Sequence, residues 1–323
     1  MTERIDVLVT EDISGAPLDD LATRHRVVLR PEAWRDRGAL RELVSRARAI
    51  VVRNRTMVDA ELLAAAPDLR IVARAGVGLD NIDLAAARER GVVVSAPLGA
   101  NAVSVAEHTL GLALALARRT VALDAGCRSG EWDRSPGTEL HGGTWGLLGA
   151  GATGRACGRL AAALGMRVLA FDPYLEPDDP ELTGAGIELV PLADAVTRSD
   201  VISIHLPATG RTRGLVDAAL LARMRPTALL INVGRGEVID ENALADALES
   251  GAPAGAALDV RAQEPPRPSR LDKLDNVLFT PHIAGITVQS QERILRLLSA
   301  DVDAVLSGGR PASAVDTRGA GRR

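Results

Sequence analysis

The sequence predicts an α/β protein built from two doubly wound parallel sheets. Short aliphatic and β-branched runs alternate with helical segments along the chain, which is typical of parallel strands joined by crossover helices. A length of 323 residues favours two domains over one. Hydrophobic residues make up 46% of the chain and charged residues 25%, so disordered, collagen-like and coiled-coil classes are disfavoured.

Charge and cysteine content exclude several classes of function. The 38 basic and 42 acidic residues leave a net charge of −4, which gives no footprint for nucleic acid or an anionic membrane surface. Cys127 and Cys157 lack metal-site spacing and no HExxH motif is present, so we expect no metal and a reduced, cytoplasmic location. The N-terminus has no signal-peptide pattern, and the apolar stretch 110–117 is too short to span a bilayer.

Two series of strand patterns divide the chain. We expect the first series at 7–10, 27–29, 49–52, 71–74 and 92–95. Residues 101–119 then have the spacing of one long helix, and the stretch 126–143, rich in Gly, Ser and charge, is typical of a loop. The second series follows at 144–149, 168–172, 187–190, 201–206, 228–233, 254–260 and 277–282. A domain boundary near 97–100 and a terminal helix at 288–306 complete the pattern.

A glycine-rich turn between a predicted strand and a predicted helix is the clearest local motif. Gly149 permits the tight turn, Gly151 lets the backbone approach a pyrophosphate, and Gly154 lets helix and strand pack closely. Asp172, at the end of the next strand, can accept hydrogen bonds from ribose hydroxyls and repels a 2′-phosphate, which favours NAD over NADP. The alternative is an incidental turn, and an Asp before Pro173 also suits a turn.

Three side chains in the second half suit acid–base chemistry on a carbonyl group. Arg235, Glu264 and His282 each follow a predicted strand at its carboxyl end, the edge of an open α/β sheet at which ligands bind. A carboxylate beside a histidine stabilises the imidazolium and fixes its tautomer, so His282 with Glu264 can deliver or accept a proton. Arg235 can bind a carboxylate through two parallel hydrogen bonds. Taken singly, each residue also fits a structural or solvated role.

Longer stretches resemble the D-isomer-specific 2-hydroxyacid dehydrogenase family over nearly the whole chain. They lie at 52–83, 101–110, 137–158, 231–244, 257–265 and 280–285. Within the family, the strings ARAGVGLDNID and GTEL are most similar to 3-phosphoglycerate dehydrogenases. The resemblance implies a Rossmann-type NAD-binding domain at 99–283, inserted into a flavodoxin-like, discontinuous substrate-binding domain at 1–98 and 284–323. It also implies a homodimer formed through the NAD-binding domain.

Position by position, the resemblance assigns roles to the acid–base candidates. It makes His282 the general acid and base, Glu264 its partner, and Arg235 a ligand of the substrate carboxylate and carbonyl. Backbone N–H groups at three neighbouring positions are implied to hold the substrate carboxylate: Gly76, Val77 and Gly78. For the cofactor, the resemblance adds eight positions to the glycines and Asp172: Ala152, Thr153, Leu206, Val233, Gly234, Asp259, Ala284 and Gly285.

The resemblance also bears on the substrate. Arg53 and Arg74 match positions that bind phosphate in phosphoglycerate dehydrogenases, and Arg55 adds charge beside Arg53, although each also fits a solvated or ion-paired arginine. We therefore expect NAD-dependent interconversion of a D-2-hydroxy acid and its 2-keto acid, with a doubly anionic substrate such as 3-phosphoglycerate. Glyoxylate or hydroxypyruvate reduction, phosphite or phosphonate oxidation, and a non-enzymatic, corepressor-like NAD-sensing scaffold stay open. Because the chain ends soon after the terminal helix, we expect a short form without a regulatory domain.

Overall fold

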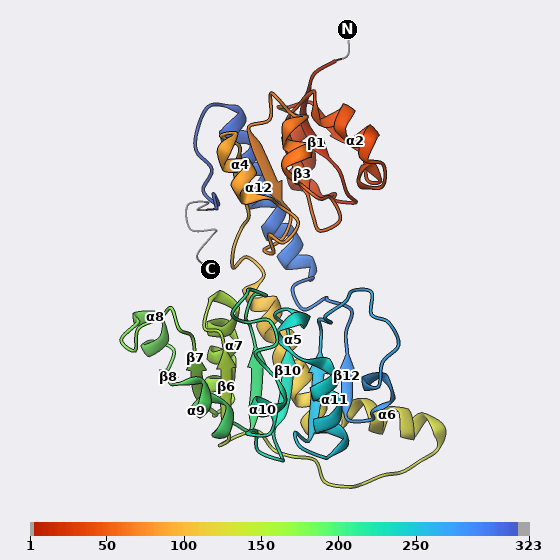
Figure 1. Ribbon diagram of the computed structural model, residues 1–323, viewed down its shortest axis with the longest axis vertical. Helices are drawn as coiled ribbons and strands as arrows, with labels where there is room; N and C mark the ends of the chain where they lie inside the picture. The colour runs from red at the N-terminus through yellow and green to blue at the C-terminus, as the bar shows by residue number, and fades with distance from the viewer. Residues whose placement is uncertain (1–2, 316–323) are drawn as a thin grey trace. The chain divides into compact units, whose positions relative to one another are not determined.

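The computed structural model describes residues 3–315 and divides into two compact units (Figure 1). Unit 1 is formed by Met1–Asn101 and Thr287–Arg323, and unit 2 by Ala102–Ile286. The domain boundaries expected from the sequence lie at 98/99 and 283/284, a little before those of the units. Residues 1–2 and 316–323 of the expected substrate-binding domain lie outside the described residues.

Unit 1 contains a five-stranded parallel sheet in the order β2-β1-β3-β4-β5. Its strands are β1 (Ile5–Val9), β2 (Val27–Leu29), β3 (Ala47–Val52), β4 (Ile71–Arg74) and β5 (Val93–Ser95). Its first helices are α1 (Ala16–Ala22), the 3-10 helix η1 (Ala33–Arg35), α2 (Arg37–Val44), α3 (Ala60–Ala64) and α4 (Leu84–Glu89). The order 2-1-3-4-5 is that of flavodoxin-like sheets. Central strand residues such as Val7, Leu8 and Ile50 are fully buried, as expected for a sheet covered on both faces.

Helix α12 (Val288–Leu306) brings the end of the chain onto this sheet, and Figure 1 shows it in blue within unit 1. It begins with a capping box, in which the Thr287 hydroxyl accepts from Ser290 N and the Ser290 hydroxyl accepts from Thr287 N. Its buried face shares one core with the strands, through Ile294, Leu295, Leu298, Val302, Val305 and Leu306. Unit 1 therefore needs residues from both ends of the sequence.

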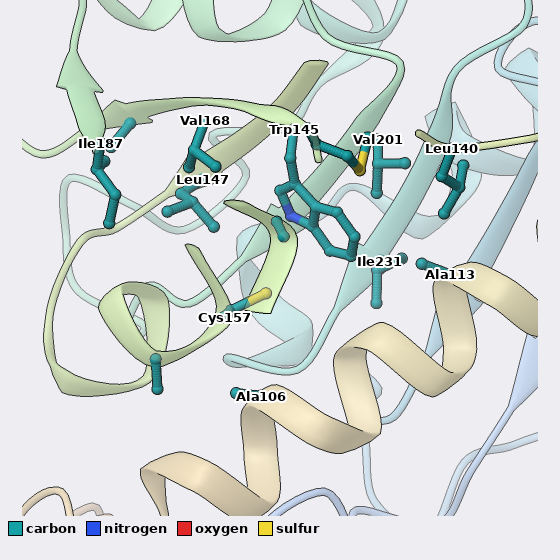
Figure 2. Close-up of a cluster of buried hydrophobic side chains, with 14 of the residues drawn as sticks. Ala106, Ala113, Leu140, Trp145, Leu147, Cys157, Val168, Ile187, Val201 and Ile231 are labelled. Atoms are coloured by element: carbon teal, nitrogen blue, oxygen red, sulfur yellow. The ribbon is translucent and has the colours of Figure 1, made fainter. Parts of the chain in front are cut away.

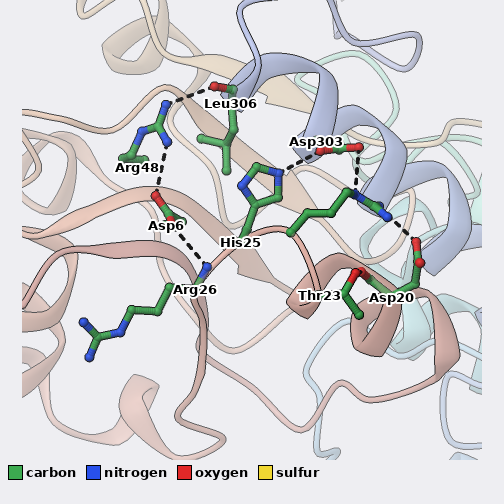
Figure 3. A network of polar contacts seen from close by, with 9 residues as sticks. Asp6, Asp20, Thr23, His25, Arg26, Arg48, Asp303 and Leu306 are labelled. Carbon is green, nitrogen blue, oxygen red and sulfur yellow. Dashed lines mark hydrogen bonds and ion pairs between the residues drawn. The ribbon is translucent and has the colours of Figure 1, made fainter.

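A polar network attaches the last turns of α12 to the start of the chain (Figure 3). Asp303 Oδ1 lies 2.7 Å from His25 Nε2. Arg48 donates to Asp6 Oδ1 at 3.1 Å and to the Leu306 carbonyl at 3.0 Å, which links β3, β1 and α12. Because Arg48 and Asp6 are partly shielded from water, their attraction is screened less than that of a surface ion pair.

Unit 2 contains a seven-stranded parallel sheet in the order β12-β11-β10-β9-β6-β7-β8. Its strands are β6 (Thr144–Leu148), β7 (Arg167–Phe171), β8 (Ile187–Leu189), β9 (Val201–Ile204), β10 (Leu229–Asn232), β11 (Gly255–Leu258) and β12 (Val277–Phe279). This is a Rossmann-type order with one added edge strand. The order reverses between β6 and β9, and ligands of such sheets bind outside the carboxyl ends of the strands at this switch point.

The helices of unit 2 are α5 (Ala102–Ala117), α6 (Thr120–Ser129), α7 (Ala152–Ala163), α8 (Pro180–Thr183), α9 (Leu192–Thr197), α10 (Ala218–Leu221), η2 (Gly236–Val238), α11 (Glu241–Glu249) and η3 (Leu271–Lys273). Figure 2 shows the core between the sheet and α5, centred on Trp145. The Trp145 indole is fully buried, and its N–H donates to Ser203 Oγ at 2.8 Å. No helix within residues 3–315 is long and apolar enough to cross a lipid bilayer.

The predicted fold class is confirmed, and one predicted element is wrong. The helix expected at 101–119 ends at Ala117, and α6 then occupies the beginning of the stretch expected as a loop at 126–143. Between the two helices, Arg119 has a left-handed φ of 52°, which turns the chain. Helix α6 buries none of its own residues, so no apolar period marks it in the sequence.

Candidate active site

The glycine-rich turn at 149–154 joins β6 to α7 at the switch point of the unit 2 sheet. Gly149 has φ 96°, a conformation that residues with a side chain rarely adopt. A Cβ atom on Gly154 would lie 2.1 Å from the Gly149 carbonyl oxygen, so only glycine lets α7 pack this closely. A Cβ atom on Gly151 would meet no described atom within 4 Å. The turn thus combines a tight bend, close packing and an open backbone, as a pyrophosphate-binding loop requires.

The amino end of α7 is suited to an anion. Gly151 occupies the N-cap position and has no side chain with which to cap the first turn. The N–H groups of Ala152 and Thr153 belong to that turn, and the helix dipole adds positive potential there. A phosphate group can therefore replace the missing cap.

Asp172 lies directly after β7 and is held against the same turn. Its Oδ2 accepts from Ala150 N at 3.0 Å, and its Oδ1 accepts from Tyr174 N at 3.1 Å. Each carboxylate oxygen can accept a second hydrogen bond. The side chain therefore fits the ribose hydroxyls of NAD while its charge opposes a 2′-phosphate.

Other predicted cofactor positions follow neighbouring strands. Leu206 comes after β9, and Val233 and Gly234 come after β10. A Cβ atom on Gly234 would lie 2.7 Å from the Leu206 carbonyl oxygen, and a Cβ atom on Gly149 would lie 3.1 Å from Leu206 Cδ2. These strand ends are packed against the glycine-rich turn. The residues at the turn and at the strand ends therefore fit a dinucleotide bound along the carboxyl edge of the sheet.

The structure brings His282 and Glu264 into contact. His282 Nδ1 lies 2.7 Å from Glu264 Oε2, and Glu264 Oε1 accepts from the backbone N–H of Arg261 at 3.1 Å. Burial acts to raise the pKa of Glu264, but the hydrogen bonds from His282 and Arg261 outweigh it and hold the pKa below its usual value. With Nδ1 engaged by an ionised carboxylate, Nε2 is the ring atom that can exchange a proton with a substrate.

Asp259 supports the turn that carries His282. It is 1% exposed, its Oδ1 accepts from Thr280 Oγ1 at 2.6 Å and Ile283 N at 2.9 Å, and its Oδ2 accepts from Ala284 N at 2.9 Å. Its carbonyl oxygen accepts from His282 N at 2.7 Å. Burial acts to raise the pKa of Asp259, but the hydrogen bonds that it accepts lower the pKa below its usual value. A contact of Asp259, Ala284 or Gly285 with the cofactor stays a prediction.

His108 joins this cluster, although sequence reasoning assigned it no role in the site. From α5, its Nε2 lies 3.0 Å from Thr280 Oγ1 and 3.6 Å from Asp259 Oδ1. Since the Thr280 hydroxyl donates to Asp259, it accepts from His108. The sequence shows only a histidine inside an apolar helix. No spacing rule connects His108 with Thr280, which lies far along the chain.

Arg235 follows β10, which is paired with β11, the strand that precedes Glu264. Its carbonyl oxygen accepts from Asn232 Nδ2 at 3.0 Å, and its Nη1 donates to the Gly234 carbonyl at 2.8 Å. A Cβ atom on Gly236 would lie 1.9 Å from the carbonyl carbon of Arg261. The backbone beside Arg235 is therefore packed directly on the segment that leads to Glu264.

In unit 1, the predicted anion-binding residues also lie at adjacent strand ends. Arg74 ends β4 and is in register with Val52, the last residue of β3, so Arg53 follows on the neighbouring strand. Gly76 has φ 154°, and a Cβ atom there would lie 1.6 Å from Arg74 Nη1. The Arg74 guanidinium thus lies over the turn 76–78, whose backbone N–H groups are predicted to hold a carboxylate.

Glu11 organises the turn that carries Arg53 and was not found by sequence reasoning. It is 4% exposed and accepts four consecutive backbone N–H groups: Arg53 at 2.7 Å, Asn54 at 3.3 Å, Arg55 at 3.1 Å and Thr56 at 3.1 Å. Burial acts to raise the pKa of Glu11, but these backbone hydrogen bonds lower the pKa below its usual value. The Arg53 guanidinium donates to the amide oxygen of Gln291, and that of Arg55 stacks on Trp34 at 4.9 Å.

Comparison with known proteins places the chain in a family. Residues 110–284 match the family model described as D-isomer specific 2-hydroxyacid dehydrogenase, NAD binding domain. The chain is 43% identical to D-3-phosphoglycerate dehydrogenase of Mycobacterium bovis over 97% of its own length and 59% of that protein. It is 42% identical to (S)-sulfolactate dehydrogenase of Chromohalobacter salexigens over 90% of its length and 94% of that protein. The crystal structure of the TT0316 protein from Thermus thermophilus is 34% identical with a TM-score of 0.88, covering 96% of this chain and 100% of that one.

The fold and the site define a dinucleotide-binding α/β protein with a histidine–carboxylate contact in its NAD-binding unit. The chain belongs to the D-isomer-specific 2-hydroxyacid dehydrogenase family, and unit 2 carries the NAD-binding domain of that family. The predicted family and the predicted cofactor, NAD, are thereby confirmed. The chain spans 59% of the length of the M. bovis phosphoglycerate dehydrogenase that it matches.

Proposed function

We propose that this protein is an NAD-dependent oxidoreductase that interconverts a D-2-hydroxy acid and its 2-keto acid. The observation that carries the proposal is the 2.7 Å contact between His282 Nδ1 and Glu264 Oε2 at the strand ends of an NAD-binding domain. NAD supplies the hydride acceptor for oxidation and, once reduced, the hydride donor for the reverse reaction. Proton transfer, carboxylate binding and polarisation of the carbonyl group are then tasks of the protein.

His282 is the general acid and base in this proposal. In reduction, the imidazolium donates its Nε2 proton to the carbonyl oxygen, and in oxidation the neutral ring accepts the hydroxyl proton at the same atom. Glu264 orients the ring and stabilises the imidazolium. Arg235 binds the substrate carboxylate and stabilises the negative charge that develops on the carbonyl oxygen.

We propose that unit 1 is the substrate-binding domain and that it receives a substrate with two anionic groups. The Gly76 N–H donates to the Arg74 carbonyl at 2.8 Å, so the backbone N–H groups proposed to bind a carboxylate are those of Val77 and Gly78. Arg53 and Arg74 offer guanidinium groups to a second anion. The named relatives support this class, because 3-phosphoglycerate and sulfolactate each carry a second anionic group besides the carboxylate. The Arg53 guanidinium is held by a neutral amide, Gln291, so this contact leaves its charge uncompensated.

An absorbance assay at the NADH band with a panel of substrates tests this function. We expect turnover of D-3-phosphoglycerate or sulfolactate with NAD. We expect a higher KM for compounds that carry one charge, namely D-glycerate assayed with NAD, and glyoxylate and hydroxypyruvate assayed with NADH. Turnover of phosphite alone would instead support an oxidase of inorganic donors. NAD binding by calorimetry without turnover of any compound would contradict the proposal and support an NAD-sensing scaffold.

Arg74→Ala tests the second anion site. We expect the KM for D-3-phosphoglycerate to rise about 10- to 100-fold with little change for D-glycerate, because a hydrogen bond to a charged group contributes about 1.5–3 kcal/mol. Arg70→Ala is the matched control, since Arg70 is exposed and precedes β4 at its opposite end. An equal rise in KM for both substrates in Arg74→Ala would argue against Arg74 as a residue that binds the phosphate group.

We propose a homodimer formed through unit 2. Helix α6 buries no residue within its own chain, and Val121 and Trp132 are 56% and 81% exposed. Large apolar side chains that are exposed to water favour burial against a second copy. Sedimentation of the protein and of a Val121→Glu variant tests this, with a dimer expected for the first and dissociation for the second. A monomeric parent protein would contradict it.

We also propose a cytoplasmic location. Cys127 and Cys157 are both free thiols, and burial raises the pKa of Cys157 to about 12, so that thiol stays protonated. Free thiols fit a reducing compartment. Fractionation of cells that express the protein tests this, and recovery outside the cytoplasm would contradict it.

A further inference from the structure

A buried arginine lies three residues before Glu264. Arg261 is 8% exposed, and its Nε and Nη2 donate to the two carboxylate oxygens of Glu241 at 3.1 and 2.9 Å. Its Nη1 lies 3.4 Å from Asp272 Oδ1, and its Nη2 donates to Ser269 Oγ at 3.1 Å. The guanidinium also lies over the ring of Phe279, 5.0 Å from its centroid. Three segments of unit 2, at Glu241, Ser269–Asp272 and Phe279, thus converge on this one side chain.

The same cluster holds the backbone that leads to Glu264. The N–H of Arg261 donates to Glu264 Oε1 at 3.1 Å, and the next N–H, of Ala262, donates to Glu241 Oε1 at 2.8 Å. One carboxylate, that of Glu241, therefore binds both the guanidinium and the main chain. The Glu264 carboxylate binds this segment through one oxygen and His282 through the other.

The other side of the segment is held by backbone packing. The position of a Cβ on Gly236 falls 1.9 Å from the Arg261 carbonyl carbon and 2.3 Å from Ala262 N, so the 261–262 peptide lies directly on η2. Gly236 is the neighbour of Arg235. The segment is therefore fixed on one side by an ionic cluster and on the other by the turn that carries the proposed carboxylate ligand.

Stability alone gives no reason for a guanidinium at this position. Removing a charge from water is costly, and a buried ion pair is often no more stabilising than apolar side chains of similar volume. What the planar guanidinium adds is direction, because its donors bind carboxylates in a fixed geometry. This favours a role in placing the segment over a role in stabilising the fold.

We propose that Arg261 is a positioning residue for the acid–base pair: its contacts with Glu241 and Asp272 hold the segment from which Glu264 reaches His282 Nδ1. The inference rests on the proposed function. In it, Arg261 contacts neither substrate nor NAD, and the reaction requires Arg261 because it holds Glu264 in place. Loss of these contacts lets Glu264 move away from His282, and the imidazole then loses its fixed tautomer.

A double-mutant cycle tests the proposal with D-3-phosphoglycerate and NAD as substrates. We expect Arg261→Met to lower kcat by up to about 10²-fold, as displacement of a catalytic group does. In a Glu264→Gln background, the same change should cost little more, because it acts through Glu264. Arg261→Lys keeps the positive charge but loses the paired hydrogen bonds, so its kcat should lie between that of the parent protein and that of Arg261→Met. Equal losses of kcat in both backgrounds would overturn the proposal.

Arg270→Met is the matched control. Arg270 binds two carboxylates, Asp246 at 2.7 Å and Glu249 at 2.5 Å, but it is exposed and its contacts lie on the surface. We expect kcat to stay near that of the parent protein, as for most surface substitutions. If Arg261→Met proves insoluble, Glu241→Gln removes the same ionic contact and should lower kcat in the same way. A Glu241→Gln protein with parental kcat would overturn the proposal.

A measurement without substrate separates this inference from the proposed function. The 15N shifts of labelled histidine at alkaline pH report which ring nitrogen carries the proton, and comparison with a His282→Gln variant identifies the His282 signals. We expect the parent protein and Arg270→Met to show the Nδ1–H tautomer at His282, and Arg261→Met to show a mixture with Nε2–H. An unchanged tautomer in Arg261→Met would contradict the inference even if the protein turns over no 2-hydroxy acid.

Discussion

His282 adopts a left-handed backbone φ of 56°, which is costly for a residue with a side chain. Asp259 holds it there, because its carbonyl accepts from His282 N and its carboxylate accepts from the next two backbone N–H groups. Such strain persists only where the surroundings determine it and is typical of functional sites. The sharp turn aims the ring at Glu264 instead of letting the chain continue along β12.

The first prediction at the scale of single residues concerns His282 itself. Replacing His282 with Ala should lower kcat about 10²–10⁴-fold, the usual contribution of a general acid–base group. NAD affinity should stay nearly unchanged, because the glycine-rich turn and Asp172 lie at other strand ends. Stopped-flow turnover and calorimetric NAD binding check both statements, with the exposed His141→Ala as control. Unimpaired turnover in His282→Ala would refute the role.

The second prediction concerns Glu11, whose carboxylate accepts four backbone N–H groups. Glu11→Gln replaces one acceptor oxygen by an amide, so buried N–H groups lose their partner, at a cost of about 1–3 kcal/mol in the free energy of unfolding at neutral pH. Since the folded pKa of Glu11 lies below its usual value of 4.5, its contribution is complete above that value and is lost as the pH falls through the folded pKa.

Urea unfolding as a function of pH checks the Glu11 prediction. The two proteins should differ at neutral pH and converge in acid. Asp12→Asn is the control, because Asp12 is the exposed neighbour of Glu11. A difference that stays constant down to acid pH would show that the ionised form of Glu11 contributes nothing.

At the scale of single residues, the sequence predicted the candidate site residues that directly follow strands. It did not predict the residues whose hydrogen bonds hold those segments in place. His282, Glu264 and Arg235 were predicted because the carboxyl ends of parallel strands meet at one edge of a sheet. Glu11 and Arg261 could not be predicted in the same way. Their roles come from backbone N–H groups and carboxylates that only the tertiary fold brings within reach, such as Glu241, twenty positions before its partner.

At the scale of elements, β6, α7 and β7 were predictable because hydrophobic runs, glycines and a terminal Asp act in one local unit. Helix α6 was not, because a helix that buries nothing has no apolar face to reveal its period. No sequence pattern predicted the 3-10 helix η2 either. It bears on the candidate site because Gly236 packs against the 261–262 peptide.

This contact carries the prediction at the scale of elements. Gly236→Ala places a methyl group 1.9 Å from the Arg261 carbonyl carbon, so η2 and the segment before Glu264 must move apart. We expect a stability loss of about 1–3 kcal/mol, as for overpacking, and a fall in kcat/KM of up to about 10²-fold. Thermal unfolding and steady-state kinetics check this. Gly210→Ala is the control, because a methyl group there meets no described atom within 4 Å. Parental kinetics in Gly236→Ala would show that the contact is irrelevant to the site.

At the scale of the whole molecule, the chain leaves unit 1 after residue 101 and returns to it at residue 287. The alternation of strands and helices predicted two doubly wound sheets, and the resemblance to a family implied that one domain is discontinuous. Periodicity alone could not assign α12 to the first sheet, because an amphipathic helix carries no record of which sheet it covers. The shared core of α12 with β1, β3 and β4 makes that assignment.

The final prediction follows from this shared core. Leu298 and Leu297 are neighbours on α12, but Leu298 is 2% exposed and Leu297 is 37% exposed. Leu298→Ala should cost unit 1 about 2–5 kcal/mol, because it removes buried methyl groups and leaves a cavity, whereas Leu297→Ala should cost much less. Hydrogen exchange measured by mass spectrometry checks where the loss falls.

Peptides from β1 and β3, at the opposite end of the sequence, should exchange faster in Leu298→Ala, while peptides from β6 and β9 in unit 2 keep the parental rate. This pattern follows because the core around Leu298 is built from unit 1 strands, and Trp145 and its neighbours form a separate core in unit 2. Faster exchange confined to α12 would mean that the helix is an appendage of unit 1, and the two ends of the chain would then not depend on each other for stability.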